Sequence, residues 1–407
     1  MQEKAKEPEI RFAGFTGAWE QRKFSKLYKR SSEKNDGSIG IERNITVATM
    51  QFKSDIRLSS DDYLKTYFTF KVGDIAFEGH QSKEFRYGRF VENDIGDGVV
   101  SHIFTVFRPI QRFDLHFWKY AISSENLMQK ILSRSTKAST MMHDLVPEDF
   151  LNETFLVPSI DEQKAVGKFL HQIDNLLTLH QRKYEKLLNI KKSMLEKMFP
   201  KEGEVVPEIR FKGFTGAWEQ RKLGDVLEFL KDGTHGTHPD ADQGPLLLSA
   251  KNIKNGDVTW DDTDRKISQA EFDMIHSNFK LKKGDVLLTI VGSIGESAIL
   301  KDPHEITFQR SVAFLRPNKT ITSGFLYSEI QGEKFQTELN NRKSTSAQPG
   351  IYLGDLSEIP LDTPPNLKEQ EEIGKFFSEI NSLLTLHQRK LEMLKNVKQA
   401  FLEKMFV

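Results

Sequence analysis

Three short polar segments in the second half of the chain hold side chains that can hydrogen-bond to the edges of nucleic-acid bases. Arginine and lysine match the acceptors of guanine, and asparagine and glutamine match adenine. The candidate residues are Thr234, His235, Thr237 and His238; Gln309, Arg310 and Ser311; and Arg342, Lys343, Ser344, Thr345 and Gln348. The third segment contains no apolar residue larger than alanine, which is typical of a loop that faces a polar ligand. Base recognition competes there with a second interpretation, a solvated surface loop.

The first half of the chain offers two segments of related character. One contains basic and aromatic residues side by side, and the other mixes basic residues with hydroxyl groups. Such side chains can hold phosphates and probe base edges. The candidates are Lys83, Arg86, Tyr87 and Arg89 in one segment, and Arg134, Ser135, Thr136 and Lys137 in the other. For each of them a solvated surface position is the alternative.

Residues that could carry catalysis are missing. The chain has no cysteine, which excludes disulfides, cysteine-based zinc sites and thiol nucleophiles. His235 and His238 lie near Asp240 and Asp242, but a Gly-Thr loop is no regular scaffold for a metal, so we predict no metal site. The phosphate-binding pattern Gly-x-x-x-x-Gly-Lys-Ser/Thr is absent from the sequence. We therefore predict that this chain has no catalytic residue and no cofactor.

Composition sets limits on the overall character of the protein. A chain of 407 residues is long enough for two or more domains. Its 58 basic and 58 acidic residues cancel, so any nucleic-acid contact needs a local cluster of basic residues or help from a partner. No run of eighteen apolar residues occurs, and the first seven residues, Met-Gln-Glu-Lys-Ala-Lys-Glu, include four charged ones and no apolar core. From these features we expect a cytoplasmic protein that does not enter membranes.

The strongest pattern is an internal duplication. The segment Pro8–Lys23 returns at Pro207–Lys222 with one change, Ala13 to Lys212. A second block, 158–199, returns at 365–406 and shares Leu-Leu-Thr-Leu-His-Gln-Arg-Lys and Leu-Glu-Lys-Met-Phe. The stretches between these blocks are dissimilar and read as mixed α/β, with strand-like segments such as 101–107 and 285–290. Both stretches keep a Gly-Asp pair and a later Arg-Pro pair. Two related domains with different recognition surfaces are the expected result.

The second repeated block has the apolar spacing of a long amphipathic helix. Its apolar residues recur every three or four positions. Some 37 residues give a rod of roughly 55 Å with one apolar stripe, and such a stripe needs a partner. We predict that the two helices pair antiparallel as a coiled coil; the alternative is that each packs on its own domain. The residues expected at the pairing or partner-binding surface are Phe169, Ile173, Leu176, Leu187, Met194, Phe376, Ile380, Leu383, Leu394 and Phe401.

Four features together resemble the specificity (S) subunits of type I restriction-modification systems, over essentially the whole chain. They are Trp-Glu-Gln-Arg-Lys at 19–23 and 218–222, the Asp-Gly-Thr-His-Gly-Thr-His-Pro loop at 232–239, the segment from Gly284 to Gly295, and the Glu-Gln pairs that precede the Leu-His-Gln-Arg-Lys helices. The first half lacks the Gly-Thr-His loop and the Gly-Ser-Ile-Gly turn. Its base contacts are therefore harder to place.

The resemblance implies a fold, partners and a function. The expected fold is mixed α/β, with target-recognition domain 1 at 1–157, a spacer helix at 158–200, target-recognition domain 2 at 201–364 and a second spacer helix at 365–407. Each domain would read one part of an asymmetric, two-part double-stranded DNA target with an unread spacer. Two methyltransferase (M) subunits would bind the helices, and restriction (R) subunits would join that core. S-adenosylmethionine, ATP and Mg²⁺ would belong to these partners.

Two other functions remain open from the residues alone. The chain could be a self-sufficient enzyme that both reads and cuts or methylates DNA. It could also be a duplicated scaffold that assembles proteins through its paired helices and never touches DNA. Methylation by the chain alone would favour the first, and the absence of sequence-specific protection of DNA would favour the second.

Overall fold

The computed structural model describes residues 7–53, 61–139, 142–277, 279–344 and 349–407. The chain divides into two compact units, Met1–Leu179 with Leu391–Val407, and His180–Lys390. Each unit therefore combines one recognition region with parts of both long helices. None of the helices in the described ranges is both long enough and apolar enough for a membrane span.

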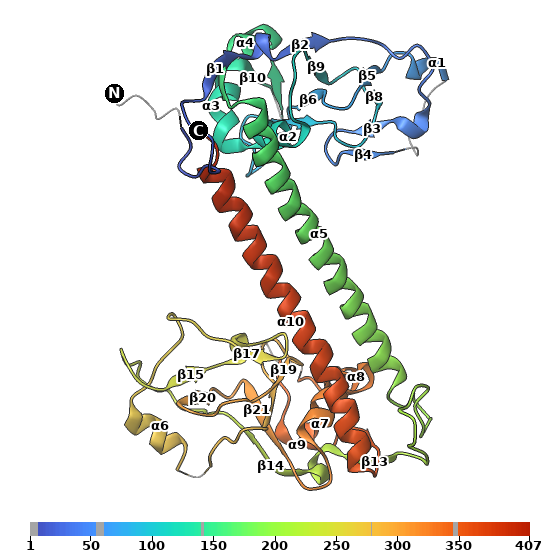
Figure 1. Ribbon diagram of the computed structural model, residues 1–407. Helices are drawn as coiled ribbons and strands as arrows, with labels where there is room; N and C mark the ends of the chain where they lie inside the picture. The colour runs from blue at the N-terminus through green and yellow to red at the C-terminus, as the bar shows by residue number, and fades with distance from the viewer. Residues whose placement is uncertain (1–6, 54–60, 140–141, 278, 345–348) are drawn as a thin grey trace. The chain divides into compact units, whose positions relative to one another are not determined.

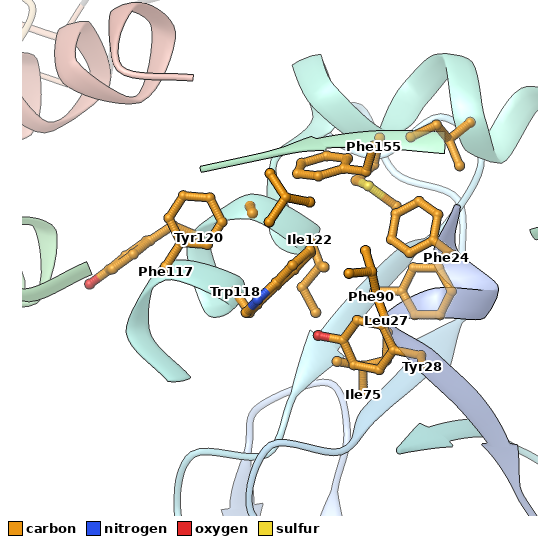
Figure 2. Close-up of a cluster of buried hydrophobic side chains, with 14 of the residues drawn as sticks. Phe24, Leu27, Tyr28, Ile75, Phe90, Phe117, Trp118, Tyr120, Ile122 and Phe155 are labelled. Atoms are coloured by element: carbon orange, nitrogen blue, oxygen red, sulfur yellow. The ribbon is translucent and has the colours of Figure 1, made fainter. Parts of the chain in front are cut away.

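The first unit is built on a four-stranded antiparallel sheet in the order β2 (Tyr28–Ser31), β9 (Thr105–Pro109), β6 (Ile75–Glu78) and β7 (Arg89–Glu92). Helix α2 (Leu115–Ser123) begins after Asp114, whose carboxylate accepts a hydrogen bond from the Phe117 amide. Figure 2 shows the aromatic core of this unit, which includes Phe24, Trp118 and Phe155. The other elements are α1 (Asp61–Leu64), α3 (Glu125–Ser135), α4 (Pro147–Asn152), β1 (Glu20–Lys23), β3 (Ile45–Thr46), β4 (Gln51–Phe52), β5 (Phe68–Phe70), β8 (Gly98–Val100), β10 (Thr136–Ala138), β11 (His143–Leu145) and β12 (Thr154–Val157).

The second unit repeats this sheet although its sequence differs. Its strands run in the order β14 (Leu227–Asp232), β21 (Val312–Pro317), β18 (Val286–Thr289) and β19 (Ser297–Ile299), again antiparallel. One pairing differs, since β15 and β20 are parallel whereas β5 and β8 are antiparallel. The other elements are α6 (Gln269–Ile275), α7 (Ser323–Ile330), α8 (Glu333–Asn341), α9 (Leu353–Ser357), β13 (Glu219–Lys222), β15 (Leu246–Leu248), β16 (Ile253–Lys254), β17 (Asp257–Val258), β20 (Ile306–Phe308) and β22 (Pro360–Thr363).

The residues that both dissimilar stretches retain form the same ion pair in each unit. The buried carboxylate of Asp74 lies 2.8 Å from Arg108, and that of Asp285 lies 2.7 Å from Arg316. Each carboxylate also accepts a hydrogen bond from the backbone amide three residues before it. The pair therefore ties the end of β9 or β21 to the turn before β6 or β18. Loss of the arginine would leave the buried carboxylate without its ion-pair partner, which costs about 3–5 kcal/mol.

The two long helices of Figure 1, α5 (Ile160–Lys197) and α10 (Leu367–Lys404), contain 38 residues each. In the first unit the rings of Phe169 and Phe401 lie 4.8 Å apart, and Asp174 pairs with Lys398 at 2.6 Å. In the second unit His180 contacts His387 at 2.8 Å, and the ring of Phe199 lies 6.1 Å from that of Phe377. Within each unit, residues with higher numbers on α5 contact residues with lower numbers on α10. The predicted antiparallel pairing is confirmed.

The predicted seam needs one correction. Leu176 and Leu383 are each 44% exposed, so they do not lie between the helices. Leu384 is buried and the matching Leu177 is half-buried instead. The reason is the helical repeat: steps of four and three residues lead from Ile173 through the position of Leu177 to His180, and a neighbouring residue is turned by about 100°. The seam also contains Ile380, which is buried, and Leu187 and Leu394, which are half-buried.

A glycine at the same position of both helices allows a close crossing within each unit. A Cβ atom on Gly167 would lie 2.6 Å from the Phe117 amide nitrogen in α2, and one on Gly374 would lie 2.8 Å from Gly324 in α7. Any larger residue would push these elements apart. Each long helix is thus held against the core helix of one recognition region.

The repeated Leu-Glu-Lys-Met-Phe ends anchor each helix in the unit that contains the other repeat. Met405 and Phe406 are buried in the core of the first unit, and Met198 and Phe199 in that of the second. The returning chain is attached in the same way both times: the Ile10 amide donates to the Lys404 carbonyl at 2.9 Å, and Ile209 donates to Lys197 at 2.8 Å. The segment 207–222 follows the end of α5 directly in the chain. Its copy, 8–23, is attached to the end of α10 by the same backbone contact, although the two are far apart in the sequence.

Candidate nucleic-acid interface

Backbone hydrogen bonds bring the three polar segments of the second unit to one edge. The Thr234 amide donates to Phe308 at 2.9 Å, and the Arg310 amide donates to Thr234 at 3.0 Å. The loop after β14 and the turn before β21 are therefore adjacent. Ile290, in the turn after β18, joins this turn through a 2.9 Å bond from its amide to the Ser311 carbonyl.

The same turn connects this edge to the loop after α8. The Ile351 amide donates to the Ile290 carbonyl at 3.0 Å, and the Ser344 amide donates to Gly350 at 2.9 Å. Two of the predicted residues, Thr345 and Gln348, lie outside the described residues. The loops that carry the described candidates thus form one continuous group, as a recognition surface requires.

The side chains of this group differ in their availability. Arg310 and Thr237 are exposed, as is His235, whose Nε2 lies 2.5 Å from Asp232. Arg342 lies at the end of α8 and pairs with Glu338 at 2.9 Å, and Lys343 follows it half-buried. Positive and hydroxyl groups therefore face solvent on loops that the backbone holds in place.

His238 has a structural role. Its ring is buried, its Nε2 lies 2.6 Å from the Thr234 hydroxyl and its Nδ1 lies 2.7 Å from Glu271. Both ring nitrogens are engaged within the protein, so the prediction that His238 contacts DNA is corrected to a structural role. Ser311 is partly committed as well, because its hydroxyl accepts a hydrogen bond from the Ala250 amide at 3.0 Å. Gln309 is half-buried, and its backbone amide donates to the Leu248 carbonyl.

In the first unit the two candidate segments also meet. The β10–β11 hairpin lies against the turn between β6 and β7, since the His143 amide donates to the Gly79 carbonyl at 2.8 Å. The ring of Tyr87 lies 5.3 Å from that of His143, edge to face. The bond between His143 and Gly79 occupies the place that the bond between Ile351 and Ile290 occupies in the second unit. The segments that follow α3 and α8 therefore correspond to each other.

The first unit offers fewer free side chains than predicted. Lys83, Arg86 and Lys137 are exposed, and the Arg86 guanidinium lies 5.6 Å from the centre of the Tyr87 ring. Arg89 is engaged by Glu78 at 2.7 Å.

The second segment of this unit is more committed to its own fold. Arg134 pairs with Glu153, whose hydrogen bond raises the pKa of Arg134. Ser135 is fully buried, and its hydroxyl donates to the Ile131 carbonyl, so the prediction that it contacts DNA is corrected to a packing role. The Thr136 hydroxyl donates to Leu132 in the same way, at 2.7 Å.

Sequence reasoning missed the function of several repeated residues. Arg11 pairs with Glu162 at 2.7 Å, and Arg210 pairs with Glu369 at 2.6 Å. The neighbouring glutamine of each helix accepts a hydrogen bond from the N-terminal end of α2 or α7. These contacts fix the start of each long helix. The duplication of Ile-Arg-Phe and Glu-Gln was the signal that could have revealed them.

The exposed side chains of the candidate surfaces suit the binding of a polar ligand. Within the described ranges no three histidine, aspartate or glutamate side chains gather as ligands for a metal ion. Exposed candidate residues of both surfaces, such as Arg310 and Lys137, carry hydrogen-bond donors. Donors of this kind suit phosphates and base edges.

Comparison with known proteins agrees with this geometry. Residues 216–396 match the family model of the type I restriction modification DNA specificity domain. The chain is 26% identical over 292 residues to the type I restriction enzyme MjaVIII specificity subunit of Methanocaldococcus jannaschii, which covers 69% of this chain and 67% of that protein. It is 28% identical over 199 residues to the EcoBI specificity subunit of Escherichia coli, covering 46% of this chain and 41% of that one.

The fold has a solved counterpart. The crystal structure of the type I restriction-modification system S subunit from M. genitalium superposes with a TM-score of 0.64, at 16% sequence identity, and covers 98% of this chain and 99% of that one. At this level of identity the likeness concerns the fold.

Proposed function

We propose that this chain is a specificity subunit of a type I restriction-modification system, and that it binds an asymmetric, two-part DNA target through its two recognition regions. In this proposal residues 1–157 and 201–364 each read one part of the target, and the helices at 158–200 and 365–407 set the spacing between them. The chain has no catalytic role of its own. S-adenosylmethionine, ATP and Mg²⁺ act in the partner subunits.

One observation carries the proposal. Both units carry a candidate segment directly after the corresponding helices α3 and α8, beside the same sheet, yet these segments hold different side chains: Lys137 in one unit, and Arg342 and Lys343 in the other. A common scaffold with different donors reads two different base sequences, because the pattern of donors and acceptors specifies the base pair. The target should therefore not be a palindrome.

The partners follow from the same proposal. Methyltransferase subunits bind the long helices, whose outer surfaces include exposed apolar residues such as Leu179, Leu188 and Leu386. Restriction subunits then join the complex that the specificity and methyltransferase subunits form. Sequence reading and catalysis are thus divided between chains.

Footprinting of the complex of this chain with its methyltransferase subunits tests the proposal. We expect two protected blocks of unlike sequence, separated by a spacer whose bases can be changed without loss of binding. We also expect no methylation when the purified chain alone is incubated with S-adenosylmethionine and target DNA. One continuous protected site, or methylation by the chain alone, would contradict the proposal.

A further inference from the structure

At one point of the helix pair a residue meets its own copy. His180 and His387 occupy the same position of the two repeats, and their Nδ1 atoms lie 2.8 Å apart. Two antiparallel helices that are copies of each other bring equivalent residues together only at the two-fold axis that relates them. A local two-fold axis therefore passes between these two histidines. Both histidines lie within the second unit, His180–Lys390.

The sequence around this axis is basic in both copies. Each histidine is followed by Gln-Arg-Lys, which places Arg182, Lys183, Arg389 and Lys390 in exposed positions of the same unit. The two-fold axis stands perpendicular to the plane of the helix pair, so it keeps Lys183 and Lys390 on the same face. Burial lowers the pKa of His180, with further contributions from His387, Lys390 and Lys183. Lys183 and Lys390 therefore both lie close enough to His180 to influence its pKa.

Lys186 extends the basic surface. It follows Arg182 by four residues and Lys183 by three, spacings that share one helix face. Arg182 and Lys186 line the same shallow groove with Asn189 and Ile190. We call Arg182, Lys183, Lys186, Arg389 and Lys390 the axial basic face.

Within the described part of the chain none of the five side chains of the axial basic face forms an ion pair, although Glu185 lines the groove beside Arg182 and Lys186. Other basic residues of the same helices have acidic partners: Lys398 pairs with Asp174, Lys197 with Glu208, and Lys164 with Asp161. In a protein whose formal charges cancel, five unpaired cations around one axis are a local concentration of positive charge.

We propose that the axial basic face holds phosphates of the unread spacer between the two parts of the DNA target. The proposal rests on the function proposed above and gives the helices a second ligand besides the methyltransferase subunits. Phosphate contacts position a protein on DNA without reading sequence, which suits a segment whose bases are free to vary. DNA is favoured over a protein partner at this face because lysine is depleted in protein–protein interfaces.

The salt dependence of DNA binding tests this inference. The variant Lys183→Gln with Lys390→Gln is assembled with methyltransferase subunits, and its affinity for target DNA and for scrambled DNA is measured over a range of salt concentrations. The slope of log K against log salt concentration should decrease by about 0.9 for each lost phosphate contact. The affinities for target DNA and for scrambled DNA should decrease by the same factor, so the preference for the target remains.

Lys192→Gln with Lys395→Gln is the matched control. It removes two exposed lysines of the same helices, nine residues after Lys183 and five after Lys390, which point to other sides of their helices. This variant should keep the slope of the wild-type complex.

An unchanged slope in the Lys183 and Lys390 variant would overturn the inference. Loss of methyltransferase binding by that variant, with an unchanged slope for the complex that still forms, would assign the face to the protein partner and would overturn it too. A wild-type complex without preference for any sequence would instead contradict the proposed function. The comparison of slopes on scrambled DNA would still decide the role of the axial basic face.

Discussion

Arg342 and Lys343 lie where α8 ends and the candidate recognition loop begins, so their replacement tests the interface directly. We expect Arg342→Ala with Lys343→Ala to weaken binding of targets by about 1–3 kcal/mol, through one part of the target only. Competition binding with DNA changed in one part or the other measures this effect. Lys280→Ala with Lys319→Ala, at exposed positions of the same unit, is the control. Equal weakening with every DNA, or none, would contradict a role in base recognition.

Glu329 gives the second unit a pH-dependent stability. It is buried on α7, and its Oε1 accepts a hydrogen bond from the Asp362 backbone amide at 3.2 Å. Burial raises its pKa to about 8 from the usual 4.5. The folded state therefore holds a proton that the unfolded state releases above pH 4.5. Its contribution to the free energy of unfolding is complete below that pH and is lost as the pH rises towards about 8.

Glu329→Gln keeps the hydrogen-bond acceptor and removes the titration. We expect the variant to gain stability relative to wild type as the pH rises from 4.5 to about 8, by at most about 1.4 kcal/mol per pH unit. Urea unfolding across this range measures the difference, with Glu333→Gln, at an exposed position, as control. A difference that does not change with pH would show that Glu329 is ionised in the folded protein.

The availability of single side chains to a ligand was predictable only in part. Arg310 and Lys137 reach solvent, as a contact with DNA requires. Ser135 and His238 could not be separated from them, because a hydroxyl or imidazole looks the same in a sequence whether its partner is water or protein. The partner of His238 is Glu271, 33 residues away on another element.

The helix seam supports a prediction at the level of elements. Leu187 and Leu394 are equivalent and half-buried in the long helices. Aspartate at both positions places charges in an apolar surface. We therefore expect unfolding at a lower temperature and a free energy of unfolding that is smaller by at least roughly 2 kcal/mol. Circular dichroism during heating measures it. Leu188→Asp with Met393→Asp, at exposed positions next to them, should unfold like wild type, and equal behaviour of both variants would argue against the seam.

Long elements were easier to predict than short ones. The apolar spacing predicted helices within 158–200 and 365–407, and the structure has them at Ile160–Lys197 and Leu367–Lys404. The expected strand at 101–107 is partly a turn, and only Thr105–Pro109 forms β9. The sheet order itself was beyond prediction, because strands of three to six residues pair with partners far away in the chain. Only the shared Gly-Asp and Arg-Pro pairs pointed to a common scaffold.

For the whole molecule, the helices set the distance between the two parts of the target under the proposed function. Insertion of four residues after Glu185 and after Glu392, which are equivalent positions, lengthens each helix by about 6 Å. We expect the spacer in the recognised DNA to grow by about two base pairs at about 3.4 Å each. Mapping of methylated bases in DNA modified by the assembled complex reads the spacer directly. Methylation at the original spacing would show that the helices do not determine it.

The buried Met-Phe ends of α5 and α10 have a consequence for how the chain can be divided. Each recognition core is completed by two side chains from the repeat that builds the other core. A polypeptide cut between residues 201 and 206 would thus yield fragments that each lack part of their own interior and carry part of the other's. Produced separately, these fragments should aggregate or remain unfolded, and produced together they should copurify as a nicked equivalent of the intact protein. Independent folding of either fragment would show that this exchange of ends is dispensable.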